Sequence, residues 1–252
     1  MELSERSTKT VQDQAFTVSS IDDADHRTRS IAIGCFDGVH LGHRDVISGC
    51  DTVLTFAPHP LRVLRPSQAP PLLTGHARKL AKLSALGVRE VVIIPFDTSW
   101  ASQTAETFVD EILVGTLNAS HVSVGFNFRF GARGAGTAGR LREDRRFGTR
   151  VVPAVTAGPV VVSSTVIRSL VERGKLTQAA KLLGAPLVQP ATIRKDRTLH
   201  FAPDLAVPAD GVHVCQVDGV LTQVSFTGRP RILDAAEAWE TKTGEVIVTF
   251  PG

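Results

Sequence analysis

The hydrophobic and polar positions in the first three quarters of the chain alternate between short apolar runs and stretches with helical spacing. Four runs have the length and composition of buried strands: residues 30–33, 52–56, 91–96 and 121–124. Between them, residues 77–86 and 104–114 carry apolar side chains at helical spacing. Strands that alternate with helices predict an α/β fold, in which helices cover the faces of a parallel sheet.

The pattern changes in the last quarter of the chain. Helical periodicity stops, and short β-like runs at 212–215 and 246–248 alternate with Gly and Pro turns. We therefore predict an α/β domain over residues 29–186 and a small β-rich domain over residues 187–252. Residues 1–28 are polar and predict a flexible lead-in.

The composition is that of an ordinary globular protein, with 42% hydrophobic and 21% charged residues. The net charge of +3 suits an anionic ligand. Lys and Arg do not form a block interleaved with aromatic residues, so nucleic acid is not an expected partner. The most apolar segment, residues 151–162, is interrupted by Pro153, Gly158 and Pro159 and is too short to span a bilayer.

The cysteines and the start of the chain point to a reducing compartment. Cys35, Cys50 and Cys215 are scattered and lack the CxxC spacing of a disulfide framework or a zinc knuckle. The first 14 residues lack the apolar stretch of a signal peptide. We expect a cytoplasmic protein that acts on small molecules and has no membrane or nucleic-acid partner. The sequence leaves its oligomeric state open.

Three unusual segments follow directly after predicted strands. They begin at Gly34, Pro58 and Gly125. In open parallel sheets, ligands bind in the crevice beyond the carboxyl ends of the strands. The three segments are therefore expected to share one crevice.

Residues 34–43 carry the strongest chemical signal, Gly-Cys-Phe-Asp-Gly-Val-His-Leu-Gly-His. The glycines let the backbone approach a ligand, and a helix predicted near His43 offers unpaired N–H groups that suit a polyphosphate. His40 and His43 are three residues apart and can stabilise charge on departing pyrophosphate. Two alternatives stay open: a Gly-rich turn with incidental histidines, or a zinc site with His59 as third ligand.

The order of several further motifs resembles a known family. They are Thr-Phe-Ala-Pro-His-Pro at 55–60, Leu-Leu-Thr at 72–74, Pro-Phe-Asp at 95–97, Val-Gly-Phe-Asn-Phe-Arg-Phe-Gly at 124–131 and Ser-Ser-Thr-Val-Ile-Arg at 163–168. Together with residues 34–43 they resemble the adenylyltransferase (FAD synthetase) module of bacterial bifunctional riboflavin kinase/FAD synthetase. The likeness covers about residues 30–186.

The resemblance implies a Rossmann-like HxGH nucleotidyltransferase fold and the transfer of AMP from ATP to FMN, giving FAD and pyrophosphate, with Mg²⁺ bridging the phosphates. It implies catalytic roles for His40, His43, Asn127 and Arg168. It implies that ATP is bound by Gly34, Cys35, Phe36, Asp37, Gly38, His40, His43, Ser163, Ser164, Thr165 and Arg168. It implies that the flavin is bound by Phe56, Pro58, His59, Pro60, Asn127, Phe128 and Arg129. It assigns no protein ligand to the metal.

Each of these segments also has a plain structural interpretation. A helix cap explains one hydroxyl of residues 163–165, but not three hydroxyls and Arg168 as well. The Phe residues in 126–130 are those of an amphipathic strand with some rings in the core, and His59 is a stiff turn residue between two prolines. The capping interpretation and nucleotide binding are equally compatible with residues 163–165, and only the resemblance favours binding.

Three departures from the family's pattern stand out. The helix after His43 has only residues 44–50 before the next strand, Ala57 replaces the acidic residue usual before Pro-His-Pro, and Thr137 replaces the Asp usual after the Asn-Phe-Arg-Phe-Gly loop. Two rival functions stay open. One is adenylyl transfer to another phosphorylated acceptor, such as pantetheine phosphate or nicotinate mononucleotide. The other, suggested by the three departures, is a weakly catalytic flavin- or nucleotide-binding protein.

In bifunctional members a β-barrel kinase follows, marked by Gly-Phe-Pro-Thr-Ala-Asn. Residues 197–205 stand at the corresponding place, with His200 in place of the Gly and without counterparts of the Thr and Asn. We therefore expect no riboflavin kinase activity and interpret residues 187–252 as a reduced relic of that barrel. An unrelated β tail is the alternative.

Overall fold

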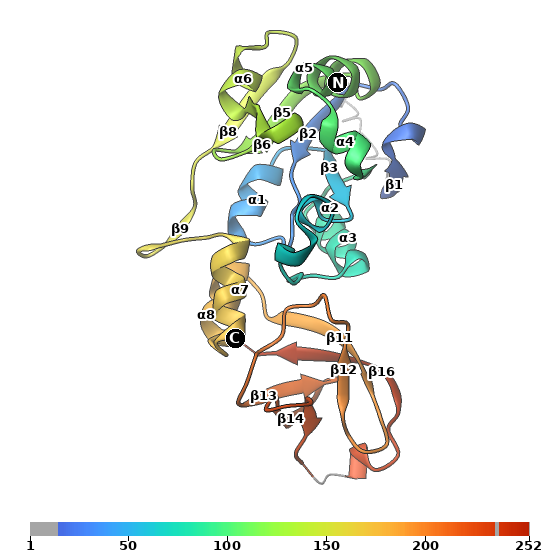
Figure 1. Cartoon of the computed structure of the whole chain (residues 1–252), viewed down its shortest axis with the longest axis vertical. Coiled ribbons are helices and arrows are strands. Elements are labelled where there is room, and N and C mark those ends of the chain that lie inside the picture. Colours follow the sequence, from blue (N-terminus) through green and yellow to red (C-terminus); the bar gives the residue numbers. More distant parts are fainter. Residues whose placement is uncertain (1–14, 235–236, 252) are drawn as a thin grey trace, which may run out of the picture.

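The computed structural model describes residues 15–234 and 237–251. Figure 1 shows a parallel sheet flanked by helices in its upper half and a β-rich part in its lower half, with α7 and α8 beside the junction. None of the helices in the described residues has the length and hydrophobicity that a bilayer crossing requires.

The upper sheet has the order β1-β4-β3-β2-β5-β8, and every neighbouring pair is parallel. Its strands are β1 (Thr17–Ser20), β2 (Arg29–Ile33), β3 (Thr52–Ala57), β4 (Glu90–Pro95), β5 (Ala119–Gly125) and β8 (Gly148–Val152). The four apolar runs of the sequence form β2, β3, β4 and β5, and the predicted α/β fold is confirmed. After β4 the chain crosses back past β3 and β2 to β5, so the strand order reverses between β2 and β5. A ligand crevice is expected at the carboxyl ends of the strands where this reversal occurs.

Part of the predicted lead-in is ordered. Residues 17–20 form β1, which pairs with β4 at the edge of the sheet, and residues 21–23 form a short 3₁₀ turn, η1 (Ile21–Asp23). The sequence pattern missed β1 because an edge strand of four residues with Val18 largely exposed has no apolar run. Residues 1–14 of the predicted lead-in lie outside the described residues.

Helices alternate with the strands as the periodicity predicts. They are α1 (Leu41–Ile47), α2 (Pro60–Leu64), α3 (His76–Ala85), α4 (Thr98–Ser102), α5 (Ala105–Thr107), the π-helical η3 (Phe108–Thr116), α6 (Ala138–Glu143), α7 (Ser164–Glu172) and α8 (Leu176–Leu183). Shorter elements are η2 (Pro66–Gln68), η4 (Ala132–Gly134), η5 (Glu237–Trp239) and the two-residue pairs β6 (Arg129–Phe130) with β7 (Gly136–Thr137) and β9 (Thr156–Ala157) with β10 (Val160–Val161). The helix expected at 104–114 forms as α5 and η3, with Thr104 as its N-cap.

The lower sheet is antiparallel, in the order β12-β11-β16-β13-β14-β15. Its strands are β11 (Leu187–Ile193), β12 (Leu199–Phe201), β13 (Val212–Val217), β14 (Val220–Ser225), β15 (Arg231–Ile232) and β16 (Gly244–Phe250). The two outer strands meet, since Thr198 forms a β-bridge with Arg231 and the Leu199 N–H donates to the Pro230 carbonyl at 2.7 Å. The sheet is thereby nearly closed into a barrel.

The hydrophobic cores do not divide at residue 187. One cluster joins Ile167 and Val171 of α7 to Val217 and Phe250 of the barrel. Helices α7 and α8 are therefore packed on the barrel, although their sequence belongs to the predicted α/β domain. A buried core shared in this way couples the two halves of the molecule.

Away from the crevice, a buried ion pair crosses three strands. Arg29 of β2 is fully buried, and its Nε lies 2.7 Å from Oε2 of Glu90 on β4. Thr52 of the intervening β3 donates its hydroxyl to the same carboxylate at 3.2 Å. Each of these three residues is the first of its strand, so the ion pair lies at the amino ends of the strands, away from the crevice at their carboxyl ends.

Candidate functional site

The loop after β2 begins the site. Gly34 continues the ladder by donating its N–H to Leu54 O at 3.1 Å, and the chain then takes a left-handed conformation at Phe36, Gly38 and Val39. Left-handed backbone at non-glycine residues is strained and gathers at functional sites. Phe36 and Val39 are each 1% exposed, so their buried side chains hold the strained turn in place.

Helix α1 starts at Leu41 with His40 as its N-cap. The His40 Nδ1 accepts the backbone N–H of His43 at 3.2 Å. An acceptor at Nδ1 fixes the neutral tautomer of His40, with the proton on Nε2. The helix therefore begins close to the position that the sequence predicts, and the first histidine closes its end.

The two histidines form a stacked pair. Their ring centroids are 3.5 Å apart at an interplanar angle of 16°, and the Phe36 ring lies edge-on to His43. Burial, with a smaller contribution from the charge of Arg168, lowers the pKa of His40 to about 4. Burial lowers the pKa of His43 well below its usual value, with His40, Lys79 and Arg168 adding to the effect. Both rings are therefore neutral hydrogen-bonding groups at pH 7.

The Nδ1 atom of His43 is buried and has no hydrogen-bond partner among the described residues. An unpaired buried polar atom is uncommon in a folded protein, and one at a crevice fits a place where a ligand or water completes the hydrogen bonding. An unpaired buried nitrogen is not expected of an incidental turn residue, so this observation favours a functional role for His43.

Asp37 is the hub of the loop. It is 4% exposed, and its carboxylate accepts the N–H groups of Leu73 and Thr74, each at 3.1 Å. Its Oδ2 also lies 2.7 Å from Nη2 of Arg168. The Ser164 hydroxyl donates to the Asp37 carbonyl at 3.0 Å. The structure thus joins the 34–43 segment to the start of α7.

Two of the three guanidinium nitrogens of Arg168 hydrogen-bond to other residues of the protein. Besides the ion pair with Asp37, its Nε donates to the Pro71 carbonyl at 2.8 Å. Among the described residues only its Nη1 has no hydrogen-bond acceptor. The guanidinium group of Arg168, for which the sequence predicted nucleotide binding, therefore mainly stabilises the 34–43 loop. Its Nη1 group is the donor that remains for a ligand.

The three hydroxyls of residues 163–165 have three different surroundings. Ser163 is the N-cap of α7, accepting the Val166 N–H at 3.3 Å, while Ser164 bonds to Asp37. Thr165 is exposed. The capping interpretation holds for Ser163 alone.

A cavity of about 200 Å³ opens beside this loop. It is lined by Cys35, Asp37, Phe56, Ala57, Pro58, His59, Arg62, Leu72, Thr74, His76, Lys79 and Asp204. The lining joins the ends of β2 and β3 to the start of α3 and to one residue of the barrel. The cavity therefore combines the first two segments that the sequence assigns to one crevice.

Lys79 is a residue of this site that the sequence analysis missed. It is 9% exposed, and its Nζ donates to Cys35 O at 3.3 Å and to Thr55 Oγ1 at 3.2 Å. Burial lowers the pKa of this ammonium group. The sequence did contain a signal for it. Lys79 lies four residues before the buried Leu83, so both side chains lie on the inner face of α3, and a lysine there must point into the protein.

His59 has a local role as well as a place in the cavity wall. It is the N-cap of α2, where its Nδ1 accepts the Leu61 N–H at 3.2 Å, and it follows a cis Ala57–Pro58 peptide. Burial and the nearby Arg168 lower the pKa of His59. The described residues contain no group of three or more His, Cys, Asp or Glu side chains that could hold a metal. The zinc alternative has no support in this arrangement.

Residues 127–129 lie apart from the loop. Asn127 and Arg129 are exposed, and no hydrogen bond or ring contact among the described residues joins them to residues 34–43. Phe126 is 53% exposed, Phe128 stacks on Phe130 at 5.6 Å, and Phe130 is buried. The strand interpretation therefore holds for Phe130 and partly for Phe128, while the third expected segment does not reach the cavity in this conformation.

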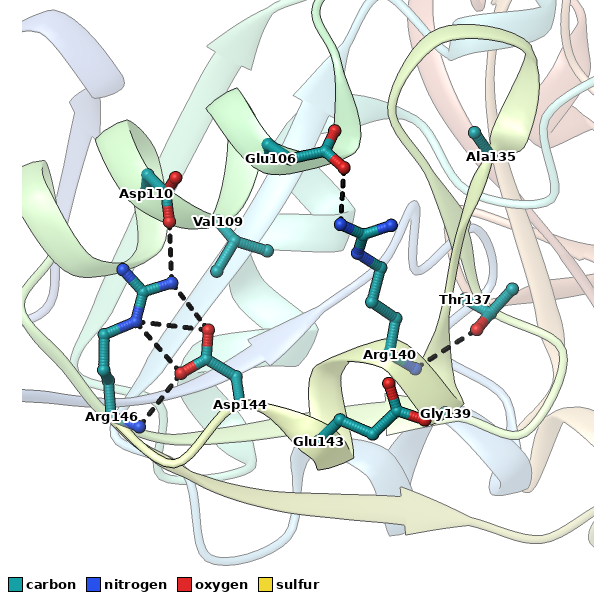
Figure 2. Close-up of a pocket in the computed structure, with 10 residues that line it drawn as sticks. All are labelled: Glu106, Val109, Asp110, Ala135, Thr137, Gly139, Arg140, Glu143, Asp144 and Arg146. Atoms are coloured by element: carbon teal, nitrogen blue, oxygen red, sulfur yellow. Dashed lines mark hydrogen bonds and ion pairs between the residues drawn. The ribbon is translucent and has the colours of Figure 1, made fainter.

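A larger cavity, of about 640 Å³, lies between η3 and α6 (Figure 2). Both arginines of its lining already pair with carboxylates: Arg140 with Glu106, and Arg146 with Asp110 and Asp144. The lining has more carboxylates than guanidinium groups. Such a surface disfavours phosphates, so size does not make this cavity the candidate site.

Comparison with known proteins identifies the family of this chain. Residues 22–166 match the family model described as FAD synthetase. This chain belongs to the FAD synthetase family. The bifunctional riboflavin kinase/FMN adenylyltransferase of Listeria monocytogenes is 35% identical over 207 residues, covering 73% of this chain and 66% of the relative. That of Bacillus subtilis is 30% identical, covering 75% of this chain and 65% of the relative.

A shorter relative is covered more completely. The protein named FAD synthetase from Listeria monocytogenes is 30% identical over 214 residues, which are 80% of this chain and 85% of the relative. The chain spans about two thirds or less of the bifunctional relatives. A crystal structure described as a macrolide-efflux protein from Streptococcus pneumoniae superposes with a TM-score of 0.78, at 25% identity, over 93% of this chain and 89% of the other.

One departure from the FAD synthetase pattern has a local explanation. Thr137, where the family usually has Asp, is the N-cap of α6 and accepts the Arg140 N–H at 3.2 Å. Thr and Asp both serve as N-caps, so the helix start is preserved while a carboxylate is lost. Nothing in the structure explains Ala57.

Proposed function

We propose that this FAD synthetase transfers AMP from ATP to FMN. A phosphate oxygen of FMN attacks the α-phosphorus of ATP, the bond from that phosphorus to the bridging oxygen of the β-phosphate breaks, and pyrophosphate leaves with both electrons of that bond. The observation that carries the proposal is the neutral, stacked His40–His43 pair at the end of β2, in a chain of this family. Positioning and charge stabilisation supply most of the catalysis in such a reaction.

Each side chain of the site has its own role in this proposal. The Nε2–H of His40 and the partly unsatisfied ring of His43 donate to phosphate oxygens as negative charge moves to pyrophosphate. Lys79 supplies a fixed positive charge beside the cavity, and the remaining donor of Arg168 faces the nucleotide. Asp37 keeps the loop in shape rather than contacting substrate, because its carboxylate is fully engaged.

Mg²⁺ enters this proposal as part of the substrate, MgATP. The described residues offer no cluster of ligands for a protein-bound ion, and Asp37 accepts three protein donors. The residues present therefore do not fit a resident Mg²⁺ site, and no step is assigned to one. The flavin is proposed to bind against Phe56, Pro58 and His59, with residues 127–129 closing over it.

The test is an incubation of the purified protein with MgATP and one acceptor at a time. The acceptors are FMN, pantetheine phosphate and nicotinate mononucleotide, and the products are separated by chromatography. FAD and pyrophosphate in equal amounts support the proposal. Consumption of another acceptor while FMN is left intact would replace it with a different adenylyltransferase, and MgATP or flavin binding without turnover would replace it with a binding protein.

We also propose that residues 187–252 are a reduced riboflavin-kinase barrel without kinase activity. His200 lies in β12 opposite Thr192, with its Nε2 3.3 Å from Thr198 Oγ1. A glycine at this place would let phosphate approach the backbone closely, and here the His200 side chain stands in its position. Riboflavin with MgATP should therefore yield no FMN, and the appearance of FMN and then FAD would show a working kinase.

A further inference from the structure

Residues 71–74, which end just before the N-cap Gly75 of α3, connect the barrel to the nucleotide loop. We call them the strap. On one side, its Leu73 and Thr74 N–H groups hold the Asp37 carboxylate, each at 3.1 Å. On the other side, the strap pairs with residues of the barrel. It is therefore the point at which the fixed geometry of residues 34–40 is connected to the C-terminal part of the chain.

The strap is attached to the barrel by a short parallel bridge between Leu72 and Leu205. The Leu72 N–H donates to Asp204 O at 2.6 Å, and the Ala206 N–H donates to Leu72 O at 2.8 Å. Backbone hydrogen bonds on both sides of one residue fix its peptide planes. The orientation of the next two N–H groups, which face Asp37, follows from this attachment.

Gln189 reinforces the same attachment from inside the barrel. It lies on β11 and is fully buried, and its Nε2 is 2.9 Å from Ala206 O, 3.3 Å from Leu72 O and 3.5 Å from Leu73 O. Its two N–H bonds thus face three backbone carbonyls at the junction. The two residues before it on β11, Leu187 and Val188, are apolar and buried.

A purely packing role does not explain an amide at this place. The Oε1 of Gln189 is buried and has no partner among the described residues. Leaving such an acceptor unpaired costs about 1–3 kcal/mol, which an apolar side chain of similar size avoids. The donors of Gln189 are therefore the feature that this position uses.

We propose that Gln189 is a positioning residue for the nucleotide site and that the barrel is a working part of the transferase. Gln189 and residues 204–206 hold the strap, the strap N–H groups hold Asp37, and Asp37 with Arg168 holds the loop that carries His40. The nucleotide site is thus completed by the C-terminal part of the chain. This inference rests on the proposed function for its ligand, MgATP, and not for the identity of the acceptor.

The test compares Gln189→Met with the parent in the full chain. Methionine keeps the length of the side chain and removes both donors. We expect the dissociation constant of MgATP, measured by calorimetry without any acceptor, to rise about tenfold, equal to 1.4 kcal/mol. The KM for the acceptor should stay within about twofold, because the groups proposed for the flavin share a cavity with the strap but make no hydrogen bond to it among the described residues.

Thr222→Val is the matched control. Thr222 is also buried in the barrel and donates its hydroxyl to Asp234, far along the chain from the strap contacts. It should lower stability by an amount comparable to Gln189→Met while leaving MgATP affinity unchanged. If both variants weaken MgATP binding equally, or if neither does, Gln189 acts only through stability and the proposal is overturned.

A second measurement keeps this test separate from the proposed reaction. Hydrogen exchange followed by mass spectrometry, without any ligand, reports on residues 34–40 and on the strap. Gln189→Met should speed exchange in both segments, and Thr222→Val in neither. Faster exchange in the strap with unchanged exchange in residues 34–40 would contradict the linkage, even if the chain acts on a different substrate.

Discussion

The Asp37→Asn substitution should destabilise the protein far more than the same Asp→Asn substitution at an exposed position. Asparagine keeps one oxygen acceptor but places an amide N–H₂ group against donors that now converge from Leu73, Thr74 and Arg168. The Asp37 side chain is 5% exposed and that of Arg168 is 14% exposed, so water replaces little of what is lost. Breaking a buried pair by removing one partner costs about 3–5 kcal/mol.

We expect the loss for Asp37→Asn to be about 3 kcal/mol, since one oxygen remains. For a chain of this size that lowers the melting temperature by about 6–12 °C. The measurement is urea unfolding with thermal melting as a second probe. Asp110→Asn is the control, because it breaks the Arg146–Asp110 pair, in which both side chains are about half exposed, and such pairs contribute roughly 0–1 kcal/mol.

A double variant sharpens this prediction. Arg168→Met alone leaves Asp37 without its cation, and in the Asp37→Asn, Arg168→Met double variant the two losses should be less than additive by about 1–3 kcal/mol. Equal stability of Asp37→Asn and Asp110→Asn, or strict additivity in the double variant, would refute the role of Asp37 as the hub of the loop.

Three further outcomes follow from the structure. His40→Asn and His43→Ala should each lower the turnover number for FAD formation by about a hundredfold or more, and unchanged turnover in both would remove their donor role. Glu90→Gln should cost about 3 kcal/mol in urea unfolding, because it strips the buried Arg29 of its main counter-ion, and should leave the KM for ATP unchanged; a loss below about 1 kcal/mol would contradict this. Riboflavin with MgATP should give no FMN by chromatography.

The sequence pattern predicted the parallel sheet because its inner strands are buried on both faces and so appear as continuous apolar runs. It missed β1, an exposed edge strand, and β8, whose burial alternates in and out along its five residues. It placed the His40–His43 loop correctly at the end of β2, since glycines directly after an apolar run mark such a turn. Local signals of this kind are contained in a short window of sequence.

Other parts of the site depend on contacts between distant residues. Gln189 reaches Leu72 across 117 positions, and Arg168 reaches Asp37 across 131. In the sequence, Arg168 reads equally well as a phosphate ligand or as the partner of a buried carboxylate, and only the fold separates the two. The role of Asp204 in the cavity wall depends in the same way on the barrel meeting the strap.

The pH dependence of stability gives a direct check on the buried histidine pair. The pKa of His40 is lowered to about 4 and that of His43 lies well below its ordinary value, so the unfolded chain binds more protons than the folded one below pH 6.5. Stability is therefore fully present above pH 6.5 and is lost as the pH falls toward 4.

His40 should contribute a loss of about 1.4 kcal/mol per pH unit in this window, or about 2 kcal/mol by pH 5, and His43 adds a loss of the same sign. Ordinary carboxylates titrate lower, near pH 4, and add little above pH 5. His40→Asn removes one titrating ring but keeps an N-cap acceptor for α1. Its unfolding free energy should fall by about 2 kcal/mol less than that of the parent between pH 7 and pH 5. Parallel curves for the two proteins would mean that His40 is not held neutral by burial, and the donor role assigned to its Nε2–H would lose its basis.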